Sequence, residues 1–238
     1  LRNQIESDLK RVLGIVVIIV ACLPIIVFSI MKWTGINSNP DNIADFESVA
    51  HLQSTAGDCS AFLVSDKHLI TAAHCLDYME EGDRVNLTFK DNPTEYVASI
   101  LYIPSDYDAD GGDNGLKKDY AILELENVTF SNYYKLQLNT STQLTDPIIV
   151  AGYPGGVTFS AATGTVTGLS WRTFDETLQI MAGAWPGNSG GPVIDKATNR
   201  VIGILNAGDK DMAGMLISLK IDVLGNDIEL AKKVTLEF

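Results

Sequence analysis

The chain is poor in basic residues and in histidine. Its 238 residues include 17 Lys and Arg against 30 Asp and Glu, which gives a formal net charge of −13, and it has three His. A surface this acidic argues against nucleic acid as a partner and against docking on an anionic bilayer, because both need basic patches. The charge excludes these partners but does not identify a substrate.

Cysteine is scarce as well, since only Cys22, Cys59 and Cys75 are present. The spacing of Cys59 and Cys75 does not suit a zinc site, which needs closely paired ligands. We expect no metal and no cofactor. A disulfide between Cys59 and Cys75 would place this part of the chain in an oxidising compartment.

Charge is missing altogether from residues 12–31. As a helix this stretch spans roughly 30 Å, the thickness of a bilayer core, and it is apolar all round. A cleaved signal peptide is the alternative, but its apolar core would be shorter. Basic residues are denser before the stretch than after it, which favours a cytoplasmic N-terminus. We expect a cytoplasmic tail (1–11), a transmembrane signal anchor (12–31), a stalk (32–45) and an extracytoplasmic remainder at the cell membrane.

From residue 46 onward, short apolar runs alternate with turn residues. Arg84–Phe89 alternates strictly, with Val85, Leu87 and Phe89 on one face. Regularly spaced short strands are typical of an all-β sandwich or barrel. Only residues 223–233 read as a helix. The predicted strands lie at 60–65, 68–72, 84–89, 96–103, 120–125, 148–151, 164–169, 177–181, 201–205 and 214–218.

One stretch, WPGNSGGPV at 185–193, surrounds a single serine with three glycines and two prolines. Glycine allows positive φ and close backbone approach, and proline fixes the flanking turns. A serine hydroxyl is a weak nucleophile that needs a base and a group to orient the base. We interpret the loop as a holder for Ser189, with an ordinary surface loop as the alternative.

Two residues elsewhere could serve Ser189. His74 ends an apolar strand in TAAHC, where small neighbours leave room for the imidazole. Asp119 lies in KKDYAIL, where a polar loop enters an apolar strand. A carboxylate at the edge of a core is costly unless it is hydrogen-bonded, and a histidine Nδ1–H would satisfy it.

The motifs TAAHC, DYAIL and GNSGGP, in the order His, Asp, Ser, resemble the chymotrypsin-like (trypsin-fold) serine peptidases. The resemblance covers about residues 46–233. It implies an all-β fold of two six-stranded antiparallel β-barrels with a short C-terminal helix. Within a peptidase domain of residues 46–238, we expect the barrels at about 46–140 and 141–222 and the helix at about 223–233.

The resemblance also implies a serine endopeptidase that cleaves protein or peptide substrates through an acyl-enzyme. Ser189 is then the nucleophile, His74 the general base and Asp119 the residue that orients the histidine. The backbone N–H groups of Gly187 and Ser189 would form the oxyanion hole. Asn188 replaces the Asp that pairs with a new N-terminus in trypsin-like zymogens, so we expect no activation by that switch.

Further implied features are a disulfide between Cys59 and Cys75 and a substrate pocket. The pocket lacks a charged residue at its base, which favours an uncharged residue before the cleaved bond. Leu205 stands where glutamyl endopeptidases have a His, so a preference for Glu is not expected. The pocket residues are Gly183, Ala184, Leu205, Asn206, Ala207 and Gly208.

Two branches of the family are similar to this chain. The segments GYPGG and VIGI look closest to the bacterial glutamyl-endopeptidase-like branch. The anchor and GNSGGP also resemble HtrA-type stress proteases, which usually carry a PDZ domain after the peptidase. The alternative functions are an HtrA-like quality-control protease lacking PDZ, and a catalytically silent homologue acting as a binding module. The oligomeric state stays open.

Overall fold

The computed structural model describes residues 46–110, 112–137, 141–208 and 214–238. The predicted tail, signal anchor and stalk (1–45) lie outside these residues. Among the helices of the described ranges, none has the length and apolar character to cross a bilayer. The transmembrane segment at 12–31 therefore stays a prediction.

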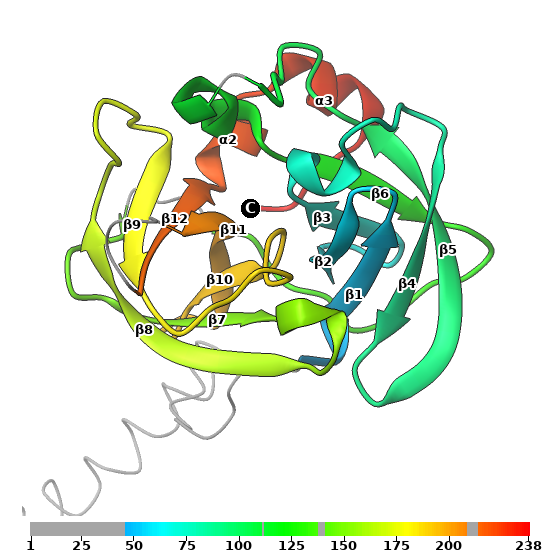
Figure 1. Cartoon of the computed structure of the whole chain (residues 1–238), viewed down its shortest axis with the longest axis horizontal. Coiled ribbons are helices and arrows are strands. Elements are labelled where there is room, and N and C mark those ends of the chain that lie inside the picture. The colour runs from blue at the N-terminus through cyan, green and yellow to red at the C-terminus, as the bar shows by residue number, and fades with distance from the viewer. Residues whose placement is uncertain (1–45, 111, 138–140, 209–213) are drawn as a thin grey trace, which may run out of the picture. The chain divides into compact units, whose positions relative to one another are not determined.

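The first half of the described chain closes into a six-stranded antiparallel barrel, on the right in Figure 1, with strand order β1-β2-β3-β6-β5-β4. In β4 the side chains of Val85, Leu87 and Phe89 are buried and the residues between them are not, which confirms the predicted alternation. The elements of this half are η1 (Phe46–Ser48), β1 (Val49–Ser54), β2 (Gly57–Leu63), β3 (His68–Thr71), η2 (Ala73–Leu76), β4 (Arg84–Phe89), β5 (Asn92–Tyr102), η3 (Gly112–Lys118) and β6 (Ala121–Leu125).

The second half forms another closed six-stranded antiparallel barrel, on the left in Figure 1, with strand order β10-β11-β12-β9-β8-β7. The two barrels confirm the predicted all-β fold of two six-stranded antiparallel barrels. The elements of this half are β7 (Pro147–Gly152), η5 (Pro154–Gly156), β8 (Ser160–Gly168), β9 (Thr177–Met181), β10 (Pro192–Asp195), β11 (Arg200–Gly208), β12 (Met215–Lys220), α2 (Asp222–Gly225) and α3 (Ile228–Lys233).

The predicted C-terminal helix is present but interrupted. Asp227 separates α2 from α3, and its side chain accepts hydrogen bonds from the N–H groups of Glu229 and Leu230. Asp is favoured at this capping position because its carboxylate satisfies N–H groups that have no partner within the helix. The carboxylate of Asp227 also accepts from the hydroxyls of Tyr102 and Tyr120, which ties α3 to the first barrel.

The barrels meet over a shared apolar cluster that includes Phe62 and Tyr120 of the first and Ile149 and Ile204 of the second. Polar links cross the same boundary, among them the hydrogen bond that the backbone N–H of Ser60 in β2 donates to the Ser189 carbonyl oxygen at 2.8 Å. The loop before β10 is therefore fixed against a strand of the other barrel. The candidate site lies at this boundary.

Candidate active site

The first barrel contributes His74 from η2, the short turn that follows β3. Ala72 and Ala73 are fully buried beside it, so the turn packs closely against the barrel. The His74 side chain remains 33% exposed. The strand end thus presents an imidazole that is anchored on one side and reachable by a substrate on the other.

Asp119, between η3 and β6, holds this histidine at two points. Its Oδ2 accepts from His74 Nδ1–H at 2.7 Å, and its Oδ1 accepts from the backbone N–H of His74 at 2.9 Å. The aspartate is only 3% exposed. Both carboxylate oxygens are therefore satisfied by one residue, which fixes the ring orientation and leaves Nε2 as the available nitrogen.

The pKa of His74 lies above its ordinary value of 6.5. Burial is the largest influence and lowers the pKa, but the hydrogen bond and the charge of Asp119, together with the charge of Asp77, outweigh it. An imidazolium at this position is thus stabilised more than burial destabilises it. The arrangement suits a base that has to accept a proton during a reaction.

The second barrel contributes Ser189 from the loop between β9 and β10. Gly187 has φ +100°, and a Cβ there would lie 2.4 Å from the Tyr153 carbonyl oxygen. Gly190 has φ +80°, and a Cβ there would lie 2.3 Å from the Ser60 carbonyl oxygen. Both positions require glycine because the backbone turns left-handed against other backbone. The glycines of the sequence motif thus set the course of the chain around the serine.

Two backbone N–H groups of this loop donate to no acceptor among the described residues. Within the described part of the chain, neither the N–H of Gly187 nor that of Ser189 donates a hydrogen bond, whereas the Gly187 carbonyl accepts from Ser60 Oγ at 2.8 Å. Unpaired N–H groups are rare where the backbone is buried, as it is at Gly187. They can therefore serve an oxygen atom that arrives with a ligand.

Asn206 in β11 joins the two halves of the site. Its carbonyl oxygen accepts from Ser189 Oγ at 3.3 Å, and its Nδ2 donates to the backbone carbonyl oxygen of Asp119 at 2.6 Å. Ser189 Oγ thus donates to Asn206 and not to His74 in this structure. The side-chain Oδ1 of Asn206 accepts from the N–H of Leu219, so both ends of the Asn206 amide group are hydrogen-bonded. Asn206 is thus linked to Asp119 through the backbone carbonyl of the aspartate and not through its carboxylate.

A cavity of about 390 Å³ opens beside Ser189. It contains five of the six predicted pocket residues. Gly183 is exposed and does not line it. The lining residues are Ala184, Trp185, Pro186, Ser189, Leu205, Asn206, Ala207, Gly208 and Leu216. A neighbouring cavity contains His74 and Asp119 and shares Asn206 and Ala207 with the first.

Leu216 lines the cavity but was not expected to from the sequence. Leu216 lies on β12 and pairs with Gly208 of β11, so the pairing of these two strands brings it to the cavity. No local motif marks such a position. Trp185 and Pro186, which also line the cavity, belonged to the motif and could have been included from their adjacency to the serine.

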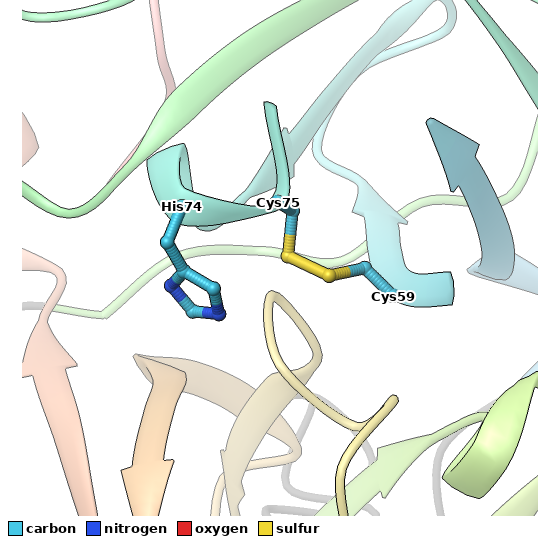
Figure 2. A group of neighbouring side chains, drawn as sticks. All are labelled: Cys59, His74 and Cys75. Atoms are coloured by element: carbon cyan, nitrogen blue, oxygen red, sulfur yellow. A yellow bond between two sulfur atoms is a disulfide. The ribbon is translucent and has the colours of Figure 1, made fainter. Parts of the chain in front are cut away.

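The expected disulfide between Cys59 and Cys75 is present, and Figure 2 shows it beside the His74 ring. Cys75 follows His74 in η2, and its Sγ lies 3.7 Å from the Ser189 carbonyl oxygen. The two sulfurs and a ring nitrogen of His74 all lie within 4.8 Å of one another. In the oxidised form these sulfurs are not thiolates, which are the form that binds metals.

Comparison with known proteins assigns the chain to a family. The family of the trypsin-like peptidase domain matches residues 59–204. "Protease Do-like 2, chloroplastic" of Arabidopsis thaliana is 29% identical over 175 residues, covering 70% of this chain and 26% of that protein. Glutamyl endopeptidase of Bacillus licheniformis is 26% identical over 172 residues, covering 65% of this chain and 51% of that protein. The chain thus spans only a quarter to a half of these relatives.

Solved structures share the fold. The active form of the Rv3671c protease of M. tuberculosis superposes with a TM-score of 0.64 at 20% identity, covering 85% of this chain and 88% of that one. A serine endoprotease from Yersinia pestis gives 0.60 at 16% identity, covering 77% and 62%. Because the family match spans more than half of the sequence, the chain belongs to the trypsin-like peptidases.

Proposed function

We propose that the protein is a serine endopeptidase whose triad is Ser189, His74 and Asp119. The observation that carries the proposal is the two-point attachment of Asp119 to His74 at the boundary where the Ser189 loop is fixed. This attachment keeps a proton on Nδ1 and leaves Nε2 unprotonated, the tautomer that a general base requires.

The reaction follows from these positions. Ser189 Oγ gives up its hydrogen bond to Asn206, turns towards His74 Nε2 and attacks the substrate carbonyl carbon while Nε2 takes its proton. The developing oxyanion accepts from the free N–H groups of Gly187 and Ser189. His74 then protonates the leaving amine, and water releases the acyl group by the same steps in reverse.

The cavity beside Ser189 favours an apolar or small uncharged residue before the cleaved bond. Its walls are built from Leu205, Leu216 and other side chains without charge. A charged side chain would lose its hydration there without gaining a partner. We therefore propose protein or peptide substrates cut after uncharged residues, which differs from a glutamyl endopeptidase.

The decisive experiment is labelling with a fluorophosphonate, which reacts with an activated serine. We expect the full chain to be labelled and Ser189→Ala not to be labelled. In a library of peptides that vary the residue before the cleaved bond, the peptides that are cleaved best should suppress the labelling. The competing function is a silent binding module, which the Ser189–Asn206 hydrogen bond would favour. A folded chain that neither labels nor cleaves any library peptide would establish that module instead.

The Do-like relatives suggest a second role, as an HtrA-like quality-control protease. Faster cleavage of an unfolded protein than of its folded form would support it. Equal rates on folded and unfolded forms of one substrate would exclude it.

We also propose that residues 12–31 anchor the peptidase unit to the cell membrane, with that unit extracytoplasmic. The uncharged run of twenty residues supports this topology. Alkaline carbonate extraction should leave the full chain in the membrane pellet, and added protease should reach the unit only from outside. Release by carbonate would contradict the anchor.

A further inference from the structure

We propose that the reduced chain binds a zinc ion through Cys59, Cys75 and His74, and that this ion silences the peptidase. The silencing rests on the proposed function, whereas the metal site does not. Figure 2 shows the three side chains gathered at η2, with the ring and the sulfurs facing the loop before β10.

The donor set fits zinc. Two thiolates and one imidazole are ligands that zinc prefers, with three protein ligands leaving a fourth position open. In a tetrahedral site with these bonds the ligand atoms lie roughly 3.5–3.8 Å apart. The sulfurs and a ring nitrogen already lie within 4.8 Å of one another, so the nitrogen has to approach by about 1 Å at most, while the two sulfurs move apart once their bond is broken.

The surroundings of His74 already resemble those of a metal-bound histidine. Its Nδ1–H donates to the buried Asp119, which leaves Nε2 to bind the metal. A carboxylate behind the ligating imidazole fixes the tautomer and raises the basicity of the ligand. Cys59 and Cys75 are buried while the His74 side chain is 33% exposed, so the metal reaches the site from the histidine side.

The chemistry needs a reductant, which we take to be a dithiol. The dithiol transfers two electrons and two protons to the Cys59–Cys75 bond, and is itself oxidised to a disulfide. Zinc then displaces the two thiol protons and binds both sulfurs. With Nε2 on the metal, no lone pair remains to take the proton of Ser189. Oxidation to the disulfide removes the thiolates and frees the base.

The spacing of the two cysteines in the sequence argued against a zinc site. The structure differs because β2 and η2 bring Cys59 next to the pair His74-Cys75. In a reducing compartment, bound zinc would thus keep the peptidase inactive. Formation of the Cys59–Cys75 disulfide would release the zinc and activate the peptidase.

The test uses the full chain with Cys22→Ser in every arm, so that only two thiols remain. The chain is reduced with a dithiol, and the dithiol is then removed under anaerobic conditions. The reduced chain is titrated with zinc in competition with a chromophoric chelator, and in a separate experiment with cobalt. We expect one zinc per reduced chain, none per oxidised chain, and thiolate-to-cobalt absorption. Zinc should abolish peptide cleavage by the reduced chain only, and a chelator should restore it.

Variants locate the site. Cys59→Ser and His74→Ala should each lose the zinc and the cobalt spectrum, and Asp119→Asn should weaken zinc binding about tenfold. His68→Ala, a histidine of the same barrel outside the cluster, should bind as the parent does. Circular dichroism shows whether each reduced chain stays folded.

Four results would overturn the proposal. The first is a folded, reduced chain that takes up no added zinc, and the second is zinc uptake that survives Cys59→Ser or His74→Ala. The third is a reduced chain that unfolds and does not refold when zinc is added. The fourth is a zinc-bound chain that still cleaves peptides. If the oxidised chain cleaves nothing, the proposed function fails, while stoichiometry and the cobalt spectrum still decide on the metal site.

Discussion

The two barrels hold their parts of the candidate active site by different means. In the first barrel, side chains fix the site, because Asp119 is hydrogen-bonded to His74 and a disulfide ties the turn beside His74 to β2. In the second barrel, the backbone conformation fixes the site. The backbone has positive φ at Gly187 and Gly190, where any Cβ would clash with another segment of the chain. No disulfide occurs among the described residues of the second barrel.

This difference follows from what each group has to do. A base must keep its ring orientation while gaining and losing a proton, so charged and hydrogen-bonded partners suit it. A nucleophile loop must also present free N–H groups, and side chains around them would only compete for those groups. Substitutions should therefore damage the halves in different ways.

The largest effect should come from the residues that exchange the proton. We expect Ser189→Ala and His74→Ala each to lower kcat by about 10⁶-fold, because members of a triad act as one unit. Adding Asp119→Ala to Ser189→Ala should cost little more. Single-turnover and steady-state cleavage of a peptide measure this, with thermal melts to show intact folding. Near-parental turnover in Ser189→Ala would end the triad interpretation.

The next effect should come from the backbone of the second barrel. Gly187→Ala should lower kcat by roughly 10²–10³-fold, because it displaces one oxyanion donor. Gly82→Ala is the matched control, since Gly82 also has positive φ (+94°) but has nothing within 4 Å of its Cβ position. Gly82→Ala should lose stability and keep kcat. Equal kcat losses in both variants would show that strain, and not the oxyanion donor, matters.

Breaking the disulfide should affect stability more than catalysis. The bond joins residues separated by 16 positions, and a loop of that size contributes about 3 kcal/mol in the chain-entropy model. Cys59→Ser with Cys75→Ser should lower the free energy of unfolding by that amount in urea titrations. In the absence of zinc, kcat/KM should change little at low temperature. Lost activity at unchanged stability would mean that the disulfide positions His74 directly.

The smallest effect concerns pH. The pKa of His74 is raised, and the base acts only when neutral, so activity should fall as the pH drops through that raised pKa. In a plot of kcat/KM against pH, the midpoint of the acid limb should thus lie above 6.5, the ordinary pKa of a histidine. Asp77→Asn removes a charge that raises this pKa and should move the limb to lower pH. Asp175→Asn, on the exposed surface of the second barrel, should leave it in place.

Local features were predictable from the sequence. The alternation in β4 and the glycines around Ser189 depend on neighbours in the chain, and the structure agrees with both. Strands β1 and β10 escaped prediction because their first residues are buried on both faces, which removes the alternation that marks a strand.

Contacts between distant strands were not predictable. The reach of Leu216 into the cavity depends on how β11 and β12 pair. The bond from Asn206 to Asp119 goes to a backbone oxygen, whose direction no sequence pattern records. The position of Cys59 beside His74 likewise arises only once the first barrel has closed.

Ser60 carries a consequence for the order of assembly. Its N–H binds the Ser189 carbonyl, its hydroxyl donates to the Gly187 carbonyl, and the same hydroxyl accepts from the N–H of Tyr153. A ribosome delivers the first barrel, with Ser60 in place, before the Ser189 loop exists. The hydrogen bonds from Ser60 to the carbonyl oxygens of Gly187 and Ser189 can therefore form only on a chain whose β2 has already been made. Under the proposed function, a chain that ends before Ser189 lacks the nucleophile, so incomplete molecules should not digest one another during synthesis.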